Sequence, residues 1–368
     1  MTWQEFEQRF SIQLNEQQKQ AVQTVEGPVL LLAVPGSGKT TVLVTRLGYM
    51  IHCKGIDPRR ILTVTYTVAA TKDMAARFTA KFGPELAEQL EFRTINGICA
   101  KVLQYYGYRT GKTPHQLLND EKRIAGILAE IYQRVERVYP TDGDLKNIRT
   151  LITYIKNMML NEDEIEALDE GAECKISVIY REYCSKLKEL QMIDYDDQMV
   201  YAYVMLKKIP WLLAYFQELY PYICVDEAQD TSKIQHAIIA LLAARTENLF
   251  MVGDEDQSIY GFRAAYPEAL LEFEQRHRGA KVLLMEENFR SDANIVAAAD
   301  HFIQKNTLRH EKHMRASRES VQQIKEIPVG TRKAQYAYLA KVAEGCTTET
   351  VVLYREHECA LPLIDLLE

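Results

Sequence analysis

The segment Ala33-Val-Pro-Gly-Ser-Gly-Lys-Thr40 places small residues between an apolar run and a helical pattern. The run from Val29 to Val34 is aliphatic, as in a buried strand, and apolar residues recur with helical spacing from Lys39 to about Ile51. A buried strand, a glycine-rich turn and a helix form the unit from which parallel sheets with helices on both faces are built. The segment therefore predicts an α/β fold with a parallel sheet.

The same loop predicts phosphate binding. Its small residues let backbone N–H groups turn toward phosphate oxygens, and the helix N-terminus adds partial positive charge. Lys39 would reach the β and γ phosphates of a nucleotide, and the Thr40 hydroxyl would ligate Mg²⁺. Ala33 stands where the strict pattern has its first glycine. The predicted nucleotide contacts of this loop are Ala33, Val34, Pro35, Gly36, Ser37, Gly38, Lys39 and Thr40.

A second apolar run ends in two adjacent acids. Tyr222 to Val225 reads as a buried strand, and Asp226 and Glu227 follow it directly. Adjacent acids are usually surface charge, but this pair follows a buried strand in a chain that has a phosphate-binding loop. We expect Asp226 to hold Mg²⁺ and Glu227 to orient or deprotonate an attacking water.

The remaining sequence divides into two patterns. Strand-like runs at 61–66 and 249–252 continue the first α/β rhythm, whereas helical spacing alone fills residues 100–215. That change indicates a helical insertion within the first domain. A second α/β rhythm begins near Lys281, and its expected elements are a strand at 282–285, a helix at 293–304, a strand at 350–354 and a final helix reaching Glu368.

Composition excludes several classes of protein. A chain of 368 residues with 47% hydrophobic residues can bury the cores of two or three domains. Its net charge of −7 argues against a polycationic surface, so nucleic acid would have to bind locally. Seven scattered cysteines without a CxxC pair indicate reduced thiols. No leader or membrane-length apolar run is visible, and we expect a cytoplasmic protein without membrane contact.

Six short motifs stand out along the chain: Leu14 to Val22, Ala33 to Thr40, Thr65 to Thr67, Val225 to Thr231, Val252 to Tyr260 and Asn288 to Ser291. In this order and spacing they resemble those of the UvrD/PcrA/Rep-like superfamily 1 DNA helicases. The resemblance covers essentially the whole chain and implies a RecA-like P-loop NTPase sheet, an all-helical insertion and a partial second RecA-like domain. The implied boundaries are 1–100 with 215–278 for the first RecA-like domain, 101–214 for the insertion and 279–368 for the incomplete second domain.

The resemblance also implies roles for residues outside the loop. Gln18 matches a glutamine that reads the adenine edge, and Phe289 matches an aromatic residue that packs on the base. Gln257 matches a glutamine that senses the γ-phosphate and couples it to DNA, and Arg290 matches an arginine finger. Thr41 replaces an arginine common near the base. With Glu227, Gln257 and Arg290 complete the implied catalytic set.

A DNA track is implied at the carboxyl ends of the strands. Bases of single-stranded DNA stack on aromatic side chains while polar and cationic groups hold the phosphates. Tyr66 and Tyr260 would also suit a core, a reading that the residues alone favour. Two segments that touch DNA in the family differ here, Val68-Ala69 and Thr94-Ile-Asn-Gly97. The implied DNA contacts are Tyr66, Thr67, Thr94, Asn96, Tyr260, Phe262 and Arg263.

The implied activity is that of an ATP-dependent DNA helicase or translocase of the UvrD type. It would use ATP and Mg²⁺ on single-stranded DNA or on a duplex with a single-stranded tail, with repair or replication proteins as candidate partners. The later family motifs do not follow Ser291, so we expect weak hydrolysis and little unwinding from this chain alone. Two alternatives are an ATP-gated module that binds or loads single-stranded DNA, and the motor part of a helicase–nuclease.

Two weaker features are assigned structural roles. His310 and His313 have the spacing of a metal pair without a third ligand, so a solvated basic stretch able to contact phosphates is the preferred interpretation. The acidic segment from Asp194 to Asp197 is interpreted as a helix cap or packing element beside the ATP-binding domain, in preference to a second metal site.

Overall fold

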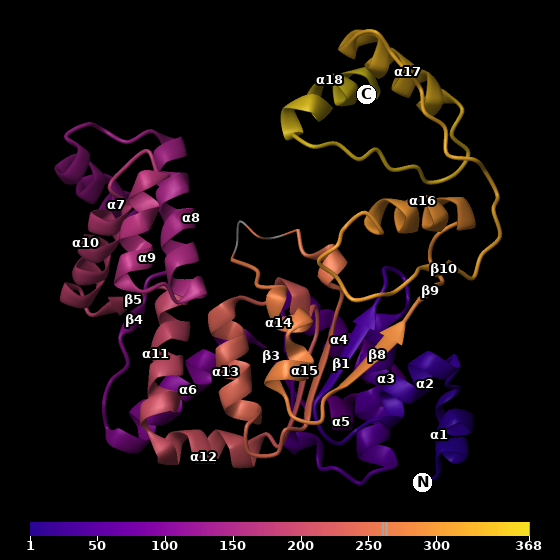
Figure 1. Ribbon diagram of the computed structural model, residues 1–368, viewed down its shortest axis with the longest axis horizontal. Coiled ribbons are helices and arrows are strands. Elements are labelled where there is room, and N and C mark those ends of the chain that lie inside the picture. The colour runs from indigo at the N-terminus through magenta and orange to yellow at the C-terminus, as the bar shows by residue number, and fades with distance from the viewer. Residues whose placement is uncertain (260, 262–263, 368) are drawn as a thin grey trace. The chain divides into compact units, whose positions relative to one another are not determined.

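The computed structural model describes residues 1–259, 261 and 264–367. Its centre is a six-stranded parallel sheet in the order β3-β2-β6-β7-β1-β8. This confirms the predicted α/β class and parallel sheet. Figure 1 labels β3, β1 and β8 of this sheet. The strands are β1 (Val29–Ala33), β2 (Ile61–Thr65), β3 (Glu91–Thr94), β6 (Tyr222–Val225), β7 (Leu249–Gly253) and β8 (Lys281–Met285).

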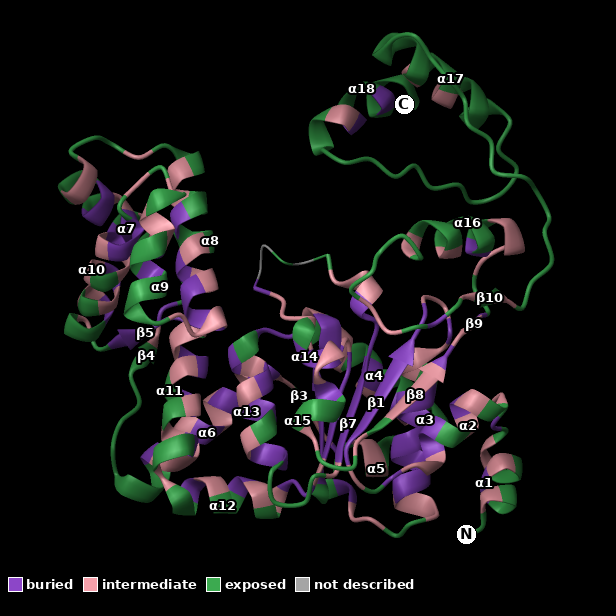
Figure 2. Cartoon of the chain, viewed as in Figure 1, coloured by how far each residue is buried: buried purple, intermediate pink, exposed green. Residues whose placement is uncertain are grey.

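Alternate residues of the strands enter two separate cores. Leu30 and Leu32 of β1 face one helical layer, whereas Val29, Leu31 and Ala33 face the other. All five residues of β1 are buried, as a central strand covered on both faces requires (Figure 2). Because every strand of this sheet runs in the same direction, the loops after β1, β6 and β7 emerge at one edge and can form one site.

One face of the sheet packs against α6, α11, α12 and α13, and the other against the first helices of the chain. The helices before the insertion are α1 (Trp3–Phe10), α2 (Glu16–Gln23), α3 (Lys39–His52), α4 (Val68–Phe82), α5 (Pro84–Ala87) and α6 (Ile95–Thr110). Those around the later strands are α11 (Tyr195–Lys208), α12 (Pro210–Leu219), α13 (Lys233–Ala243), α14 (Glu268–Leu271), α15 (Phe273–Arg276) and α16 (Ala293–Ile303).

The segment between α6 and α11 forms a helical group with a core of its own. Isoleucine, leucine and tyrosine side chains from α7, α8 and α10 fill that core, as the helical spacing predicts. The helices here are α7 (Glu121–Glu136), α8 (Asp142–Met158), α9 (Glu162–Ala167) and α10 (Ile176–Glu189). The segment is not all-helical as predicted, because two-residue strands, β4 (Gln116–Leu117) and β5 (Met192–Ile193), pair within it and are too short to leave a pattern in the sequence.

The first strand of the segment that the sequence assigns to a second domain, β8, belongs to the first sheet. β8 pairs with β1 and extends the first sheet at its edge, because its apolar residues complete the layer beside β1. Beyond it, β9 (Glu287–Asn288) pairs with β10 (Arg315–Ala316). The chain divides into two compact units, 1–319 and 320–368. The finer domain boundaries given above stay predictions.

The second unit contains α17 (Arg332–Glu344) and α18 (His357–Leu367), which Figure 2 shows as largely exposed. The strand predicted at 350–354 is wrong: Val351 to Tyr354 form no strand. Their β-branched and aromatic pattern suits a strand, but a strand needs a partner, and the described residues of this unit contain none. The final helix is confirmed as far as Leu367, the last described residue.

The cysteines and the lengths of the helices bear on the chain as a whole. All seven cysteines are free thiols, as their spacing predicts. Among the described helices, none has both the length and the apolar composition that a membrane-spanning segment needs.

Candidate functional site

The glycine-rich loop leaves the carboxyl end of β1 and turns into α3 with two glycines in left-handed conformations. Gly36 has φ +71° and Gly38 has φ +88°, conformations that glycine adopts at little cost. Gly38 is the N-cap residue of α3, so the free N–H groups of the first helical turn face the loop. Ala33 is the last, fully buried residue of β1, outside the turn, which explains why a methyl group is tolerated there.

Gln18 lies against this loop. Its side-chain Nε2 donates to the carbonyl of Ser37 at 2.9 Å, and its Oε1 accepts from the backbone N–H of Asn15 at 3.1 Å. The second contact is half of a capping box at the start of α2. The structure thus brings Gln18 to the phosphate-binding loop, while its role toward adenine stays a prediction.

Lys39 and Glu227 meet across the site. The Lys39 Nζ donates to the Glu227 carboxylate at 2.9 Å, and Gln229 Nε2 donates to the same oxygen at 2.8 Å. Burial raises the pKa of Glu227, but Lys39 and the hydrogen bond from Gln229 outweigh burial and hold it below its usual value. Glu227 also has a left-handed backbone with φ 50°, a conformation that costs a non-glycine residue about 1–3 kcal/mol and is often retained at functional sites.

Asp226 is 7% exposed and has no ion pair among the residues that the structure describes. Burial and the adjacent Glu227 raise the pKa of its carboxyl to about 6. A buried oxygen donor without a cationic partner is the kind of group that binds Mg²⁺, so Asp226 fits the predicted metal role. Thr40, the other predicted ligand, lies half-buried in the first turn of α3.

Gln257 follows β7 in a short 3₁₀ turn, Glu255–Gln257. Its Nε2 donates to Asp254 Oδ2 at 2.7 Å, and the backbone N–H of Asp254 donates to Gln229 Oε1 at 3.1 Å. Gln229 therefore connects Asp254 to Glu227. Gln229 is not among the site residues predicted from the sequence, although it lies two residues after Glu227.

The segment Asn288 to Arg290 lies on the phosphate-binding loop. The backbone N–H of Phe289 donates to the Gly36 carbonyl at 3.0 Å. A Cβ added at Gly36 would lie 2.8 Å from Arg290 Cβ and 2.9 Å from Asn288 Oδ1, so only glycine allows this approach. Gly36 therefore lies next to Phe289 and Arg290. All three are predicted nucleotide contacts, and they come from widely separated parts of the sequence.

A cavity of about 260 Å³ lies beside Asp226 at the carboxyl ends of β2, β3 and β6. Tyr66, Thr94 and Asn96, three of the predicted DNA contacts, line it together with Asp226. Thr94 and the exposed Thr67 also act as N-caps, of α6 and α4 respectively. The predicted contacts Tyr260, Phe262 and Arg263 lie outside the described residues.

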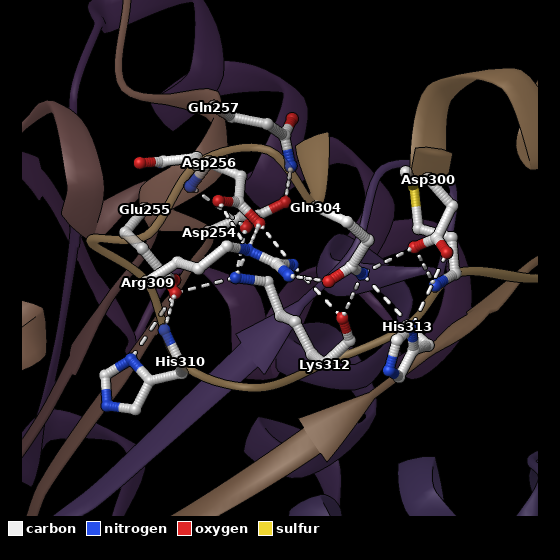
Figure 3. A network of polar contacts seen from close by, with 12 residues as sticks. Asp254, Glu255, Asp256, Gln257, Asp300, Gln304, Arg309, His310, Lys312 and His313 are labelled. Atoms are coloured by element: carbon white, nitrogen blue, oxygen red, sulfur yellow. Dashed lines mark hydrogen bonds and ion pairs between the residues drawn. The ribbon is translucent and has the colours of Figure 1, made fainter. Parts of the chain in front are cut away.

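The stretch from Arg309 to Lys312 is not the solvated basic segment predicted from its sequence. The Lys312 side chain is 1% exposed and lies 3.1 Å from Asp254, 2.7 Å from Glu255 and 2.8 Å from Asp256 (Figure 3). Arg309 forms a bidentate contact with Asp256, its Nε donating to Oδ1 at 3.0 Å and its Nη2 to Oδ2 at 2.8 Å. The prediction is wrong because three consecutive acids after β7, distant in sequence, take these cations out of solvent.

Glu255 has an unusually stable negative charge in this cluster. Burial raises its pKa, but hydrogen bonds from His310 and Lys312 outweigh burial and lower it to about 2. The ring of His310 lies 3.4 Å from the same carboxylate. Among the described residues, no group of three or more His, Cys, Asp or Glu side chains has an arrangement that could hold a metal ion.

Asp194 has the structural role expected of it. Its carboxylate caps α11 by accepting from the backbone N–H of Asp197 and pairs with buried Lys156 at 2.7 Å. The next residue of α8, Asn157, accepts a hydrogen bond from the Ser232 hydroxyl at 2.9 Å. This contact, which sequence analysis missed, joins the helical insertion to the segment after Glu227.

Comparison with known proteins agrees with this geometry. Residues 14–278 match the UvrD/REP helicase N-terminal domain. The chain is 31% identical over 329 residues to the ATP-dependent DNA helicase PcrA of Staphylococcus epidermidis, covering 89% of this chain and 45% of the relative. It is 33% identical over 303 residues to PcrA of Bacillus subtilis, covering 82% of this chain and 41% of the relative. The chain therefore spans less than half the length of these curated relatives.

Proposed function

Because the chain belongs to the UvrD/REP helicase family, we propose that it forms the ATP-hydrolysing part of a motor that acts on single-stranded DNA. The contact between Lys39 and Glu227 carries the proposal, since it joins the phosphate-binding loop to the acidic strand end. ATP is the proposed substrate and Mg²⁺ the proposed cofactor. The relatives named above are ATP-dependent DNA helicases, and helicase activity is proposed here for a protein containing this chain.

Lys39 and Glu227 suggest how substrate binding would prepare hydrolysis. In the structure the Lys39 ammonium helps to lower the pKa of the Glu227 carboxyl and forms a hydrogen bond with one of its oxygens. Triphosphate in the loop would draw that ammonium to its β and γ oxygens, so that the half-buried Glu227 loses its strongest partner and becomes a better base. Glu227 would then accept a proton from the water that attacks the γ-phosphate.

Other residues would hold and shield the phosphates. Thr40 and Asp226 would ligate Mg²⁺, which supplies neutralisation of phosphate charge when it is bound. Arg290, positioned beside Gly36, would stabilise negative charge that develops on the γ-phosphate. Gln257 would detect that phosphate, and Gln18 and Phe289 would hold the base.

The cavity next to Asp226 is the proposed start of the DNA track. Tyr66 would stack on a base, while Thr94 and Asn96 would contact the sugar-phosphate backbone of the single-stranded DNA. Asp226 lies in the same cavity wall, so nucleotide and DNA would be bound by neighbouring groups. This proximity supports coupling between the two ligands. A cytoplasmic location and contacts with repair or replication proteins belong to the same proposal.

Equilibrium binding of a non-hydrolysable ATP analogue with Mg²⁺, with and without a poly-dT oligonucleotide, tests the proposal. We expect each ligand to change the affinity for the other by about fivefold or more, the usual range of coupling between sites. Lys39→Ala should abolish analogue binding, whereas Lys54→Ala, which changes an exposed lysine after α3, should not. Unchanged analogue binding by Lys39→Ala would refute the proposed nucleotide site.

A further inference from the structure

Lys312 connects a segment distant in sequence to the residues around Glu227. Its Nζ lies 3.1 Å from Asp254 Oδ1, while the other carboxylate oxygen of Asp254 accepts from Gln257. One buried carboxylate therefore holds Lys312 on one side and the Gln257 amide on the other, as Figure 3 shows. The Asp254 side chain is 0% exposed, so water cannot replace either contact.

Lys312 supplies the positive charge at the centre of a cluster of three carboxylates. Three carboxylates, from Asp254, Glu255 and Asp256, gather within 3.1 Å of one ammonium. Arg309 neutralises only Asp256 among them by direct contact. Without Lys312, the buried Asp254 would face Glu255 and Asp256 with no cation of its own, and Asp254 would move or take up a proton.

The segment that carries Lys312 also reaches the other side of the phosphate site. Arg315 and Ala316 pair with Glu287 and Asn288 in the β9–β10 ladder, and the Ser317 N–H donates to the Asn288 carbonyl at 3.0 Å. Asn288 in turn accepts from the backbone N–H of Arg290 at 2.8 Å. A single stretch of chain thus contacts the residues that hold Gln257 and those that hold Arg290.

We propose that Lys312 is a positioning residue for recognition of the γ-phosphate: it fixes Asp254, and through Asp254 the amide of Gln257. This inference rests on the proposed function, in which Gln257 distinguishes ATP from ADP. Its consequence is specific. Loss of Lys312 impairs the preference for the triphosphate and leaves binding of the diphosphate, which Gln257 does not sense, unaltered.

The test compares the affinities of MgADP and of a non-hydrolysable ATP analogue with Mg²⁺ for the same protein. In Lys312→Met, which keeps side-chain length and removes the charge, we expect the preference for the analogue to fall by about tenfold, equivalent to about 1.4 kcal/mol. The matched control is Lys305→Met, at an exposed lysine shortly after α16, which should keep the preference. Melting temperature and MgADP affinity verify that each variant is folded.

A double-mutant cycle separates positioning from a merely structural role. In the Gln257→Ala background, Lys312→Met should reduce the preference no further, because both substitutions act through the same amide. If Lys312→Met does not fold, Asp254→Asn tests the same connection from its other end and should also reduce the preference. A folded variant of either kind that keeps the wild-type preference would overturn the inference.

Failure of the inference and failure of the proposed function give different results. If wild-type protein binds neither nucleotide, or binds both equally whether or not Lys39 is replaced, the proposed function falls and the inference with it. If wild-type protein prefers the analogue and Lys39→Ala abolishes binding, but Lys312→Met behaves like Lys305→Met, only the role of Lys312 is refuted.

Discussion

The Lys39 ammonium lies 2.9 Å from the Glu227 carboxylate, although the two residues are 188 positions apart in the chain. The contact exists because β1 and β6 end at the same edge of the sheet, on either side of β7. It helps to hold the pKa of Glu227, the proposed base, below its usual value, and it places the Lys39 ammonium beside the proposed phosphate site. Both effects depend on the parallel topology of the sheet and on the elements that surround the loop.

Replacing Gly36 by alanine should separate the loop from the segment that carries Arg290. The added methyl would lie 2.8 Å from Arg290 Cβ, closer than carbon atoms pack. The matched control is Gly27→Ala, because Gly27 also has a positive φ, +82°, but a methyl group added there would have nothing within 4 Å. Both variants should lose about 1 kcal/mol of unfolding free energy to backbone strain.

Only Gly36→Ala should also slow ATP hydrolysis, because it alone displaces Arg290. Chemical denaturation and single-turnover hydrolysis, performed on both variants, measure the two effects separately. Equal hydrolysis rates in the two variants would show that the approach of Arg290 to the loop is unimportant for catalysis.

Removal of the Tyr66 ring should weaken binding of single-stranded DNA. Stacking on an aromatic side chain contributes about 1–3 kcal/mol per base, so Tyr66→Ala should lower the affinity for an oligonucleotide by about 5-fold to 150-fold. Tyr108, 84% exposed on α6 and outside the cavity beside Asp226, supplies the control Tyr108→Ala. Fluorescence anisotropy measures both affinities, and an equal loss in the two variants would contradict the proposed track.

His236 should make the protein less stable in acid. Burial on α13, with Arg276 nearby, lowers the pKa of its ring to about 3, whereas the unfolded chain should show an ordinary value near 6.5. Between these values the unfolded state binds one more proton, so the unfolding free energy falls as the pH falls. The loss should reach about 2 kcal/mol between pH 7 and pH 5.

Urea denaturation at several pH values measures this dependence. His236→Gln should flatten the curve between pH 7 and pH 5, because the glutamine side chain does not titrate. His301→Gln, which replaces an exposed histidine of α16, should leave the slope unchanged. Parallel curves for wild type and His236→Gln would show that another group causes the acid sensitivity.

The elements near the phosphate-binding loop are predictable because their signals are local. The strands at 29–33, 61–65, 222–225 and 249–253 lie within one residue of their predicted bounds, since each is an apolar run followed by polar or small residues. The meeting of Lys39 with Glu227 follows from the parallel topology. The order of the motifs, which matches that of the UvrD-like helicases, adds Gln257 and Arg290 to the predicted site.

Other features depend on contacts that no local pattern encodes. Lys312 reads as one of several basic residues, and only the fold brings it to Asp254, 58 positions earlier. Residues 351–354 have strand composition, but their unit offers no described strand to pair with. Gln229 is the exception, because its place two residues after Glu227 could have identified it as an amide that supports the proposed base.

The central claim is that Glu227 activates water for hydrolysis of ATP bound at Lys39. Single-turnover hydrolysis of MgATP, with protein in excess and with and without poly-dT, tests it most directly on wild type and Glu227→Gln. We predict that DNA accelerates hydrolysis by the wild type. Glu227→Gln should bind ATP normally and hydrolyse it about 10²–10⁴ times more slowly, the range expected for loss of a general base. Hydrolysis at the wild-type rate by Glu227→Gln would contradict the account, and ATP binding without any hydrolysis by the wild type would favour an ATP-gated binding module.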